Sequence, residues 1–336
     1  MKMTYASRRS SYIMGSLGAT IQILAGWWDV YSHILFPGVD PWWNPAHLTL
    51  YTGIAIMIIA VWRGLRARPA QPTPAMVPIK FMNTAGLRLA AVGTVIEIVA
   101  GVWNEIVHRV VQSEPRIAPA HALLVVGMTT VAFGMVIGLT IEHGMIKRGF
   151  IPASALQRWT TLFCLILTFT SIWLAAAGAF VYLAGAFRAW FPNLVWAVML
   201  SIIAPLVLVP AKRVLPRLGT MVSIAIIFNG VTFFFLVLYL QVSPYIPWGL
   251  TALFLFDLLV AGLNRVMITA RAVLVASTVT GILFGVTYYP FTMYLFPWSL
   301  APSPLVGVVF VGWAAGTILG NKVYAKVTST VLGSVA

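Results

Sequence analysis

Ten long apolar runs constrain the fold of this 336-residue chain more than any other feature of its sequence. A helix that spans a bilayer needs about 20 mostly apolar residues. The runs lie approximately at residues 11–35, 48–63, 82–108, 119–141, 158–187, 193–210, 218–241, 247–263, 270–296 and 303–320. Only 8% of the residues are charged, against about 25% in a soluble domain. The sequence therefore predicts an all-α polytopic membrane protein with about ten transmembrane helices.

The basic residues predict how these helices are oriented. With the N-terminus in the cytoplasm, 18 of the 21 Lys and Arg residues fall in inner segments, and only Arg109, Arg116 and Arg188 fall in outer loops. Because cytoplasmic loops are enriched in Lys and Arg, we predict that both termini are cytoplasmic and that the chain lies in the plasma membrane. Contact with an anionic inner leaflet accounts for the net charge of +14, so no nucleic-acid partner is expected.

An internal repeat organises the first part of the chain. The segment TIQILAGWWDVYSH, residues 20–33, aligns with VIEIVAGVWNEIVH, residues 95–108, at an offset of 75. Farther on, NPAHLTLYTG, residues 44–53, aligns with APAHALLVVG, residues 118–127, at an offset of 74. Two matched blocks in the same order indicate a duplicated helical hairpin.

The distribution of polar residues predicts where the domains divide. The repeats, at about residues 15–65 and 90–140, fill a first part at residues 1–143, which holds all five histidines and six of the seven acids. An inner linker is predicted at residues 144–157. The remainder, residues 158–336, is aliphatic and aromatic with one acid, and we expect it to form a six-helix membrane bundle.

Each copy of the repeat places three potential metal ligands within reach of one another. Asp29 and His33 are four residues apart, so they share one helix face. His47 follows Pro45 in the first turn of the return helix, where proline is favoured, so it can face them. The equivalent residues of the second copy are Asn104, His108 and His121. Convergent oxygen and nitrogen donors of this kind predict two metal sites near the outer membrane face, for copper, zinc or ferrous iron.

Other polar residues accompany these two predicted sites. Asn104 makes the second site less anionic than the first, and hence weaker, unless Glu105 or Glu114 contributes. Gln22 and Glu97 are also equivalent positions, about two turns inward from the ligands. An ionisable residue at that depth is costly and by default functional. We therefore expect Gln22, Glu97 and Glu105 to support the ligands or to handle protons.

This ligand pattern resembles a known family. An Asp-x3-His with a histidine about a dozen residues later, followed by a related Asn-x3-His and histidine, is similar to the C subunit of copper membrane monooxygenases, the particulate methane and ammonia monooxygenases. The segment DPWWNPAHLTLY is also similar to the loop and helix start of ammonia monooxygenase C subunits. The resemblance covers about residues 15–140 and excludes the six later helices. It implies copper bound by two sets of residues: Asp29, His33 and His47, then Asn104, His108 and His121.

The same resemblance implies a place in an oxidative complex with other membrane subunits, in which copper and dioxygen act on a small apolar substrate. Two alternatives are compatible with the residues: a transporter or metal-handling permease, and a structural subunit with a stabilising metal. Carriers with inverted repeats flip their second copy across the membrane, whereas both copies here run outward and back. Asp257, the acid of the last part, is expected either to be functional or to pair with Arg265, two turns away.

Overall fold

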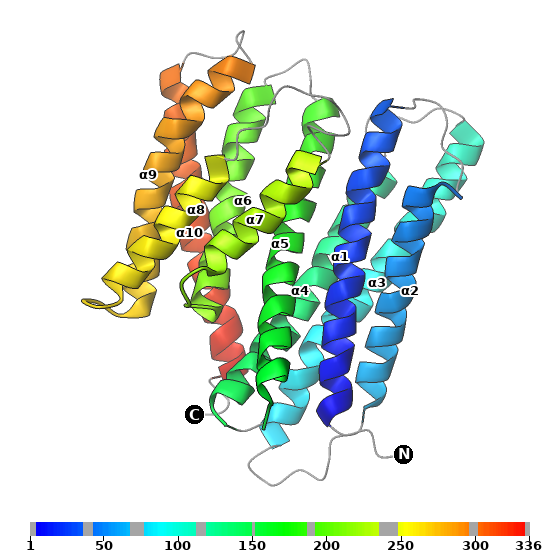
Figure 1. The fold of residues 1–336 in the computed structure, drawn as a ribbon. Helices are drawn as coiled ribbons and strands as arrows, with labels where there is room; N and C mark the ends of the chain where they lie inside the picture. The colour runs from blue at the N-terminus through cyan, green and yellow to red at the C-terminus, as the bar shows by residue number, and fades with distance from the viewer. Residues whose placement is uncertain are drawn as a thin grey trace. The chain divides into compact units, whose positions relative to one another are not determined.

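The structure, a computed structural model, describes residues 5–35, 43–67, 77–111, 119–149, 152–186, 192–234, 248–295 and 302–332. These residues form ten helices and no strand (Figure 1). The helices are α1 (Tyr5–Leu35), α2 (Pro45–Arg66), α3 (Val77–Val111), α4 (Pro119–Lys147), α5 (Ala155–Ala186), α6 (Pro192–Val214), α7 (Thr220–Phe233), α8 (Trp248–Leu263), α9 (Thr269–Leu295) and α10 (Pro302–Leu332). The predicted all-α fold is confirmed.

Four helices in the described part of the chain are long and apolar enough to cross a membrane. They are Pro45–Arg66 in α2, Thr84–Val107 in α3, Pro119–Lys147 in α4 and Ala155–Ala176 in α5. Helices satisfy their backbone hydrogen bonds internally, as hydrocarbon requires, and these expose large apolar side chains such as Ile58, Val95 and Val126. The chain is therefore a multi-pass membrane protein in contact with the lipid bilayer. The other six predicted spans stay predictions.

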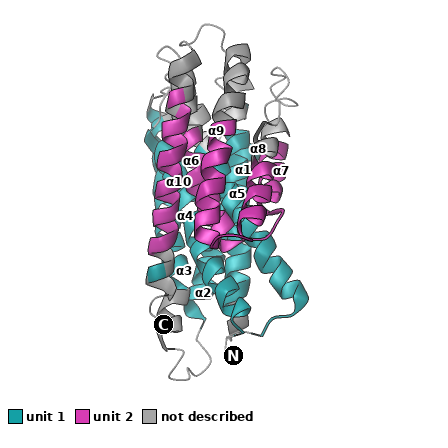
Figure 2. Cartoon of the chain, turned by 90° about the vertical axis from the view of Figure 1, so that its left-hand side faces the viewer, with its two compact units in different colours: residues 1–178, 327–336 teal, residues 179–326 magenta. Residues whose placement is uncertain are grey.

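The chain divides into two compact units (Figure 2). Unit 1 comprises residues 1–178 and 327–336, and unit 2 comprises residues 179–326. The segment 144–157, predicted as the linker between the hairpins and the six-helix bundle, lies inside unit 1. The division between the two compact units falls within α5, and the predicted domain boundary at 144–157 stays a prediction.

Two polar contacts tie the first part of α5 to α1 within unit 1. Thr20 Oγ1 lies 2.9 Å from Ser171 Oγ, and either hydroxyl can donate. Trp27 Nε1 donates to the carbonyl oxygen of Leu174 over 2.9 Å. Buried hydroxyl and indole groups need such partners, so the part of α5 that belongs to unit 1 packs on α1.

Within unit 1, α1 pairs with α2 and α3 with α4, while α1 also packs on α4 and α2 on α3 (Figure 1). The tyrosine ring of Tyr12, on α1, lies against Gly138 of α4, and the side chain of Leu87, on α3, lies against Gly64 of α2. Tyr12 and Leu87 are equivalent positions of the repeat, and so are Gly64 and Gly138. The two hairpins therefore exchange equivalent contacts, as a two-fold arrangement requires.

In unit 2, a buried ion pair joins α6 to α8. Lys212 donates to Asp257, and both side chains are fully buried. Asp257 Oδ2 also accepts hydrogen bonds from the backbone N–H groups of Met221, at 2.9 Å, and Val222, at 3.2 Å. These groups lie in the first turn of α7, whose N-cap residue is a glycine without a capping side chain. The predicted pairing of Asp257 with Arg265 is wrong, because Arg265 is exposed and Asp257 pairs instead with Lys212 of another helix.

Candidate metal centre

The end of α1 and the start of α2 bring a carboxylate and an imidazole together. Asp29 Oδ1 lies 2.9 Å from His47 Nε2, and the two residues are 8% and 7% exposed. Charged and polar pairs interact strongly where water is excluded. The structure thus places two of the three side chains of the first predicted site next to each other, from two different helices.

Local sequence at the start of α2 fixes the backbone of His47. Asn44 is the N-cap, and its Oδ1 accepts a hydrogen bond of 2.7 Å from the His47 N–H. Pro45 then occupies the first helical position, where its missing N–H costs nothing, and the Leu48 N–H donates to the Asn44 carbonyl oxygen over 3.0 Å. These bonds are typical of a well-capped helix. His47 is therefore held at a defined place facing α1.

For the remaining ligand of each predicted site, His33 or His108, the structure describes only the position in the helix. His33 lies in α1, one turn after Asp29, and His108 lies in α3, one turn after Asn104. Their side chains lie outside the described residues. Among the side chains that are described, no group of three or more His, Cys, Asp and Glu residues gathers in the manner of a metal site. The roles of all six residues as metal ligands stay predictions.

The second hairpin holds the equivalent residues in the same helical positions. Asn104 lies on α3 and His121 is the third residue of α4, as His47 is of α2. Both side chains are half-buried. The Asn104 Oδ1 atom is inaccessible to solvent and accepts no hydrogen bond from the described residues. Glu105 is half-buried as well, and Glu114 lies outside the described residues. At the position of Asp29, the second hairpin therefore carries the neutral amide of Asn104 in place of a carboxylate.

The Asp29–His47 pair fits the donor chemistry of a transition-metal site. Carboxylate oxygen and imidazole nitrogen are ligands of copper, zinc and ferrous iron. Ligands on bonds of about 2.0–2.1 Å to one tetrahedral ion lie about 3.3 Å apart. The observed separation of 2.9 Å between Asp29 Oδ1 and His47 Nε2 is shorter than this value and suits a direct hydrogen bond. The donor types fit a metal, but the two atoms would have to move apart slightly to bind one ion together.

Gln22 and Glu97 form a second polar level in the two hairpins. Each lies seven residues before Asp29 or Asn104, which is about 10.5 Å along the helix, and both are 0% exposed. In the first hairpin the acid is Asp29 and the amide is Gln22. In the second hairpin the levels are reversed, with Asn104 and Glu97. Each hairpin therefore carries one acid and one amide at these two positions, in opposite order.

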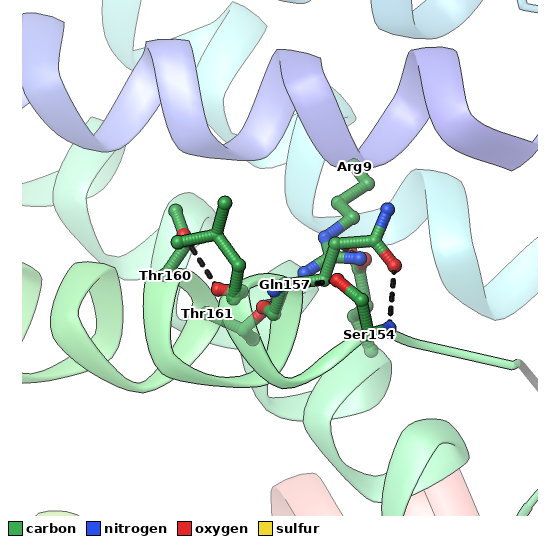
Figure 3. A network of polar contacts seen from close by, with 7 residues as sticks. Arg9, Ser154, Gln157, Thr160 and Thr161 are labelled. Atoms are coloured by element: carbon green, nitrogen blue, oxygen red, sulfur yellow. Dashed lines mark hydrogen bonds and ion pairs between the residues drawn. The ribbon is translucent and has the colours of Figure 1, made fainter.

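A polar cluster missed by the sequence analysis joins α1, α4 and α5 (Figure 3). Arg9 Nε lies 3.2 Å from Glu142 Oε1, with both side chains buried. The Arg9 guanidinium also donates to the carbonyl oxygen of Gln157 and, over 3.1 Å, to Thr161 Oγ1. Ser154 and Gln157 exchange hydrogen bonds as a capping box at the start of α5. The sequence signal that could have indicated this cluster was the position of Arg9 and Glu142, each at the end of an apolar run.

Comparison with known proteins adds no relative: no protein-family model, curated protein or solved structure matches this chain. Function has to be inferred from the chemistry of its own residues.

Proposed function

We propose that the chain is a copper-binding subunit of an oxidative membrane complex, with its principal metal site in the first hairpin. The observation that carries this proposal is the 2.9 Å approach of Asp29 Oδ1 to His47 Nε2 across two helices, in a buried place. Histidine and carboxylate donors in a duplicated pattern support a metal, and the resemblance to the monooxygenase C subunit supports copper. In this proposal ten helices cross the plasma membrane, both termini are cytoplasmic, and the metal lies near the outer face.

Six residues would hold metal in this proposal: Asp29, His33 and His47 in the first hairpin, and Asn104, His108 and His121 in the second. Bound copper supplies one-electron chemistry toward dioxygen. The carboxylate of Asp29 offsets part of the metal charge, whereas the neutral amide of Asn104 does not. The first site is therefore the stronger one, and the second is auxiliary. Zinc and ferrous iron accept the same donors, and copper binds most tightly in a site of given shape.

The surroundings of both hairpins suit an apolar substrate that arrives from the lipid. Close to His47 on α2, Leu48 is 49% and Tyr51 is 40% exposed. Close to Asn104 on α3, Trp103 is 42% and Ile106 is 54% exposed. These outward faces border lipid in a membrane-spanning helix, so a small apolar molecule dissolved in the bilayer meets the hairpins without crossing water. Other membrane subunits would complete the complex on part of this surface.

The Asp29–His47 contact also supports a second proposal, distinct from the structural subunit with a stabilising metal, in which the pair fastens α1 to α2 without a metal. A direct hydrogen bond at 2.9 Å is good geometry for that purpose. The substitution Asp29→Asn separates the two functions, because an amide oxygen still accepts from an imidazole N–H but is a poorer metal ligand. Loss of metal with unchanged thermal stability supports the metal site, whereas unchanged metal content supports the fastening role.

The decisive experiment is metal analysis of the purified full-length protein. The double variant His33→Ala/His47→Ala is expected to lose the more tightly held copper, together with its spectroscopic signature. His143→Ala is the matched control, because His143 lies on α4 and has no counterpart in the first hairpin. Equal metal content in the wild type and the double variant would refute the proposal.

A further inference from the structure

Glu97 is an ionisable side chain buried in the span Thr84–Val107 of α3. Its exposure is 0%. Both carboxylate oxygens are inaccessible, and neither has a hydrogen-bond partner among the described residues. Buried polar side chains ordinarily have partners. This glutamate therefore needs a separate explanation, which the metal hairpins do not provide.

A glycine on the return helix makes room for this side chain. A methyl group added at Gly127 of α4 would lie 2.7 Å from Glu97 Cγ and 3.0 Å from the Gly93 carbonyl oxygen. Real side-chain carbons do not approach that closely, so any residue larger than glycine would displace Glu97 or part the helices. The glutamate lies in a close-fitting cradle formed by the two helices.

The first hairpin contains the same cradle with an amide in it. A methyl group added at Gly53 of α2 would lie 2.6 Å from Gln22 Cγ and 3.0 Å from the Gly18 carbonyl oxygen. Gln22 is 0% exposed, and its amide atoms are inaccessible and without a partner among the described residues. Glutamine has the shape of a protonated glutamic acid and carries no charge. The first hairpin thus holds Gln22, a neutral side chain, at the position where the second hairpin holds Glu97.

Neither carboxylate oxygen of Glu97 has a hydrogen-bond partner among the charged side chains that the structure describes. On α4, His121 lies six residues before Gly127, about 9 Å along the helix. Glu142 lies fifteen residues after Gly127, about 22 Å away, and pairs with Arg9. The other titratable side chains described on α1 to α4 are Arg8, Tyr12, Asp29, His47, Tyr51, Arg63, Arg66, Arg88, Glu105, His143 and Lys147.

We propose that Glu97 is a proton-binding group within the membrane, and that the cradle of Gly93 and Gly127 holds it as the neutral acid. An ionised carboxylate buried without a partner is strongly disfavoured, and acids inside membrane spans serve proton relays in many proteins. A bound metal cation is a poorer explanation, because hard cations require several oxygen ligands and no group of three or more His, Cys, Asp and Glu side chains gathers among the described residues. The inference goes beyond the proposed function, because it requires no copper.

Infrared spectroscopy of the full-length protein in lipid vesicles tests this inference directly. A protonated carboxyl group has a C=O stretch that an ionised one lacks. The substitution Glu97→Gln is expected to remove such a band, whereas Glu142→Gln, at an acid paired with Arg9, is expected to leave that band in place. Stripping metal with a chelator is expected to leave the band unchanged. Identical carboxylic-acid bands in the wild type and Glu97→Gln would overturn the proposal, as would loss of the band on adding sodium or removing metal.

A gain-of-function variant keeps the proposal testable even if Glu97→Gln fails to fold. Gln22→Glu places a second carboxyl group in the equivalent cradle, and we expect a second band of comparable intensity. Labelling gives an independent readout, because an apolar carbodiimide forms a stable adduct with a carboxyl group that carries a proton. Adducts are expected at Glu97 and at the new Glu of the variant, and not at Asp257, which is paired with Lys212. If Gln22→Glu added no carboxylic-acid band to the infrared spectrum, the proposal that the cradle holds a protonated acid would be contradicted. Labelling of Asp257 without labelling of Glu97 would contradict it as well.

Discussion

The two hairpins of unit 1 share one backbone plan and differ in where each carries its acid. Asp29 lies at the level of the predicted metal ligands in the first hairpin, and Glu97 lies two turns away in the second. The amides Asn104 and Gln22 occupy the remaining two positions. Because Gly53 and Gly127 make nearly identical contacts, the difference between the hairpins is chemical rather than architectural. In our proposals, the first copy therefore carries the stronger metal site, and the second copy carries the proton-binding group beside its auxiliary metal site.

Exchanging the acid and the amide at the ligand level is the strongest test of this division. Asp29→Asn is expected to weaken copper binding in the first hairpin at least about tenfold, or 1.4 kcal/mol, because the anionic ligand is lost. Asn104→Asp is expected to strengthen binding in the second hairpin, and the double variant to move the tighter site there. Copper titration of the purified variants measures both changes. Equal affinity in all four proteins would show that the two acids are not divided as we propose.

The next largest effect concerns the cradle that both hairpins share. Gly53→Ala and Gly127→Ala each place a methyl group where less than 3.0 Å of space is available. Overpacking of this kind costs about 1–3 kcal/mol, and similar contacts predict similar losses. Thermal unfolding in detergent measures the effect. Gly101→Ala is the control, since no atom lies within 4 Å of an added methyl group there. A loss at one cradle only would show that the hairpins are not equivalent in packing.

The helices and the approach of Asp29 to His47 could be predicted from the sequence because local signals encode them. Apolar runs, prolines at helix starts and an i to i+4 spacing are each visible within one or two turns. From these signals one could predict that Pro45 opens the return helix and that Asp29 can face His47. The second prediction also required the repeat, which indicated a closed helical hairpin.

Contacts between distant helices could not be predicted in the same way. Lys212 and Asp257 are 45 residues apart, and spacing along one helix pointed to Arg265 instead. Arg9 and Glu142 meet only because α1 packs on α4. The alignment of the repeat showed that Gly53 and Gly127 coincide, but only the packing revealed that each admits a long polar side chain.

A moderate effect is expected from the N-cap that distinguishes the two hairpins. Asn44 caps α2 through the His47 N–H, whereas the equivalent residue of the second hairpin is Ala118. Asn44→Ala is expected to destabilise the helix start by about 0.5–2 kcal/mol and to weaken copper binding at His47. Calorimetry and copper titration check the two effects. Wild-type copper affinity in Asn44→Ala would mean that the cap does not position the histidine.

The smallest predicted effect concerns the attachment of α1 to α5. Trp27 is 5% exposed and its indole N–H bonds the Leu174 carbonyl oxygen, whereas the equivalent residue of the second hairpin, Val102, is 57% exposed. Trp27→Phe keeps most of the buried ring and removes the donor, so we expect a loss of about 0.5–1.5 kcal/mol in the free energy of unfolding. Val102→Ala, on the lipid-facing side of α3, is expected to change stability less. The Trp27 hydrogen bond belongs to the first hairpin. A loss as large in Val102→Ala would therefore show that this bond does not distinguish how the two hairpins are attached.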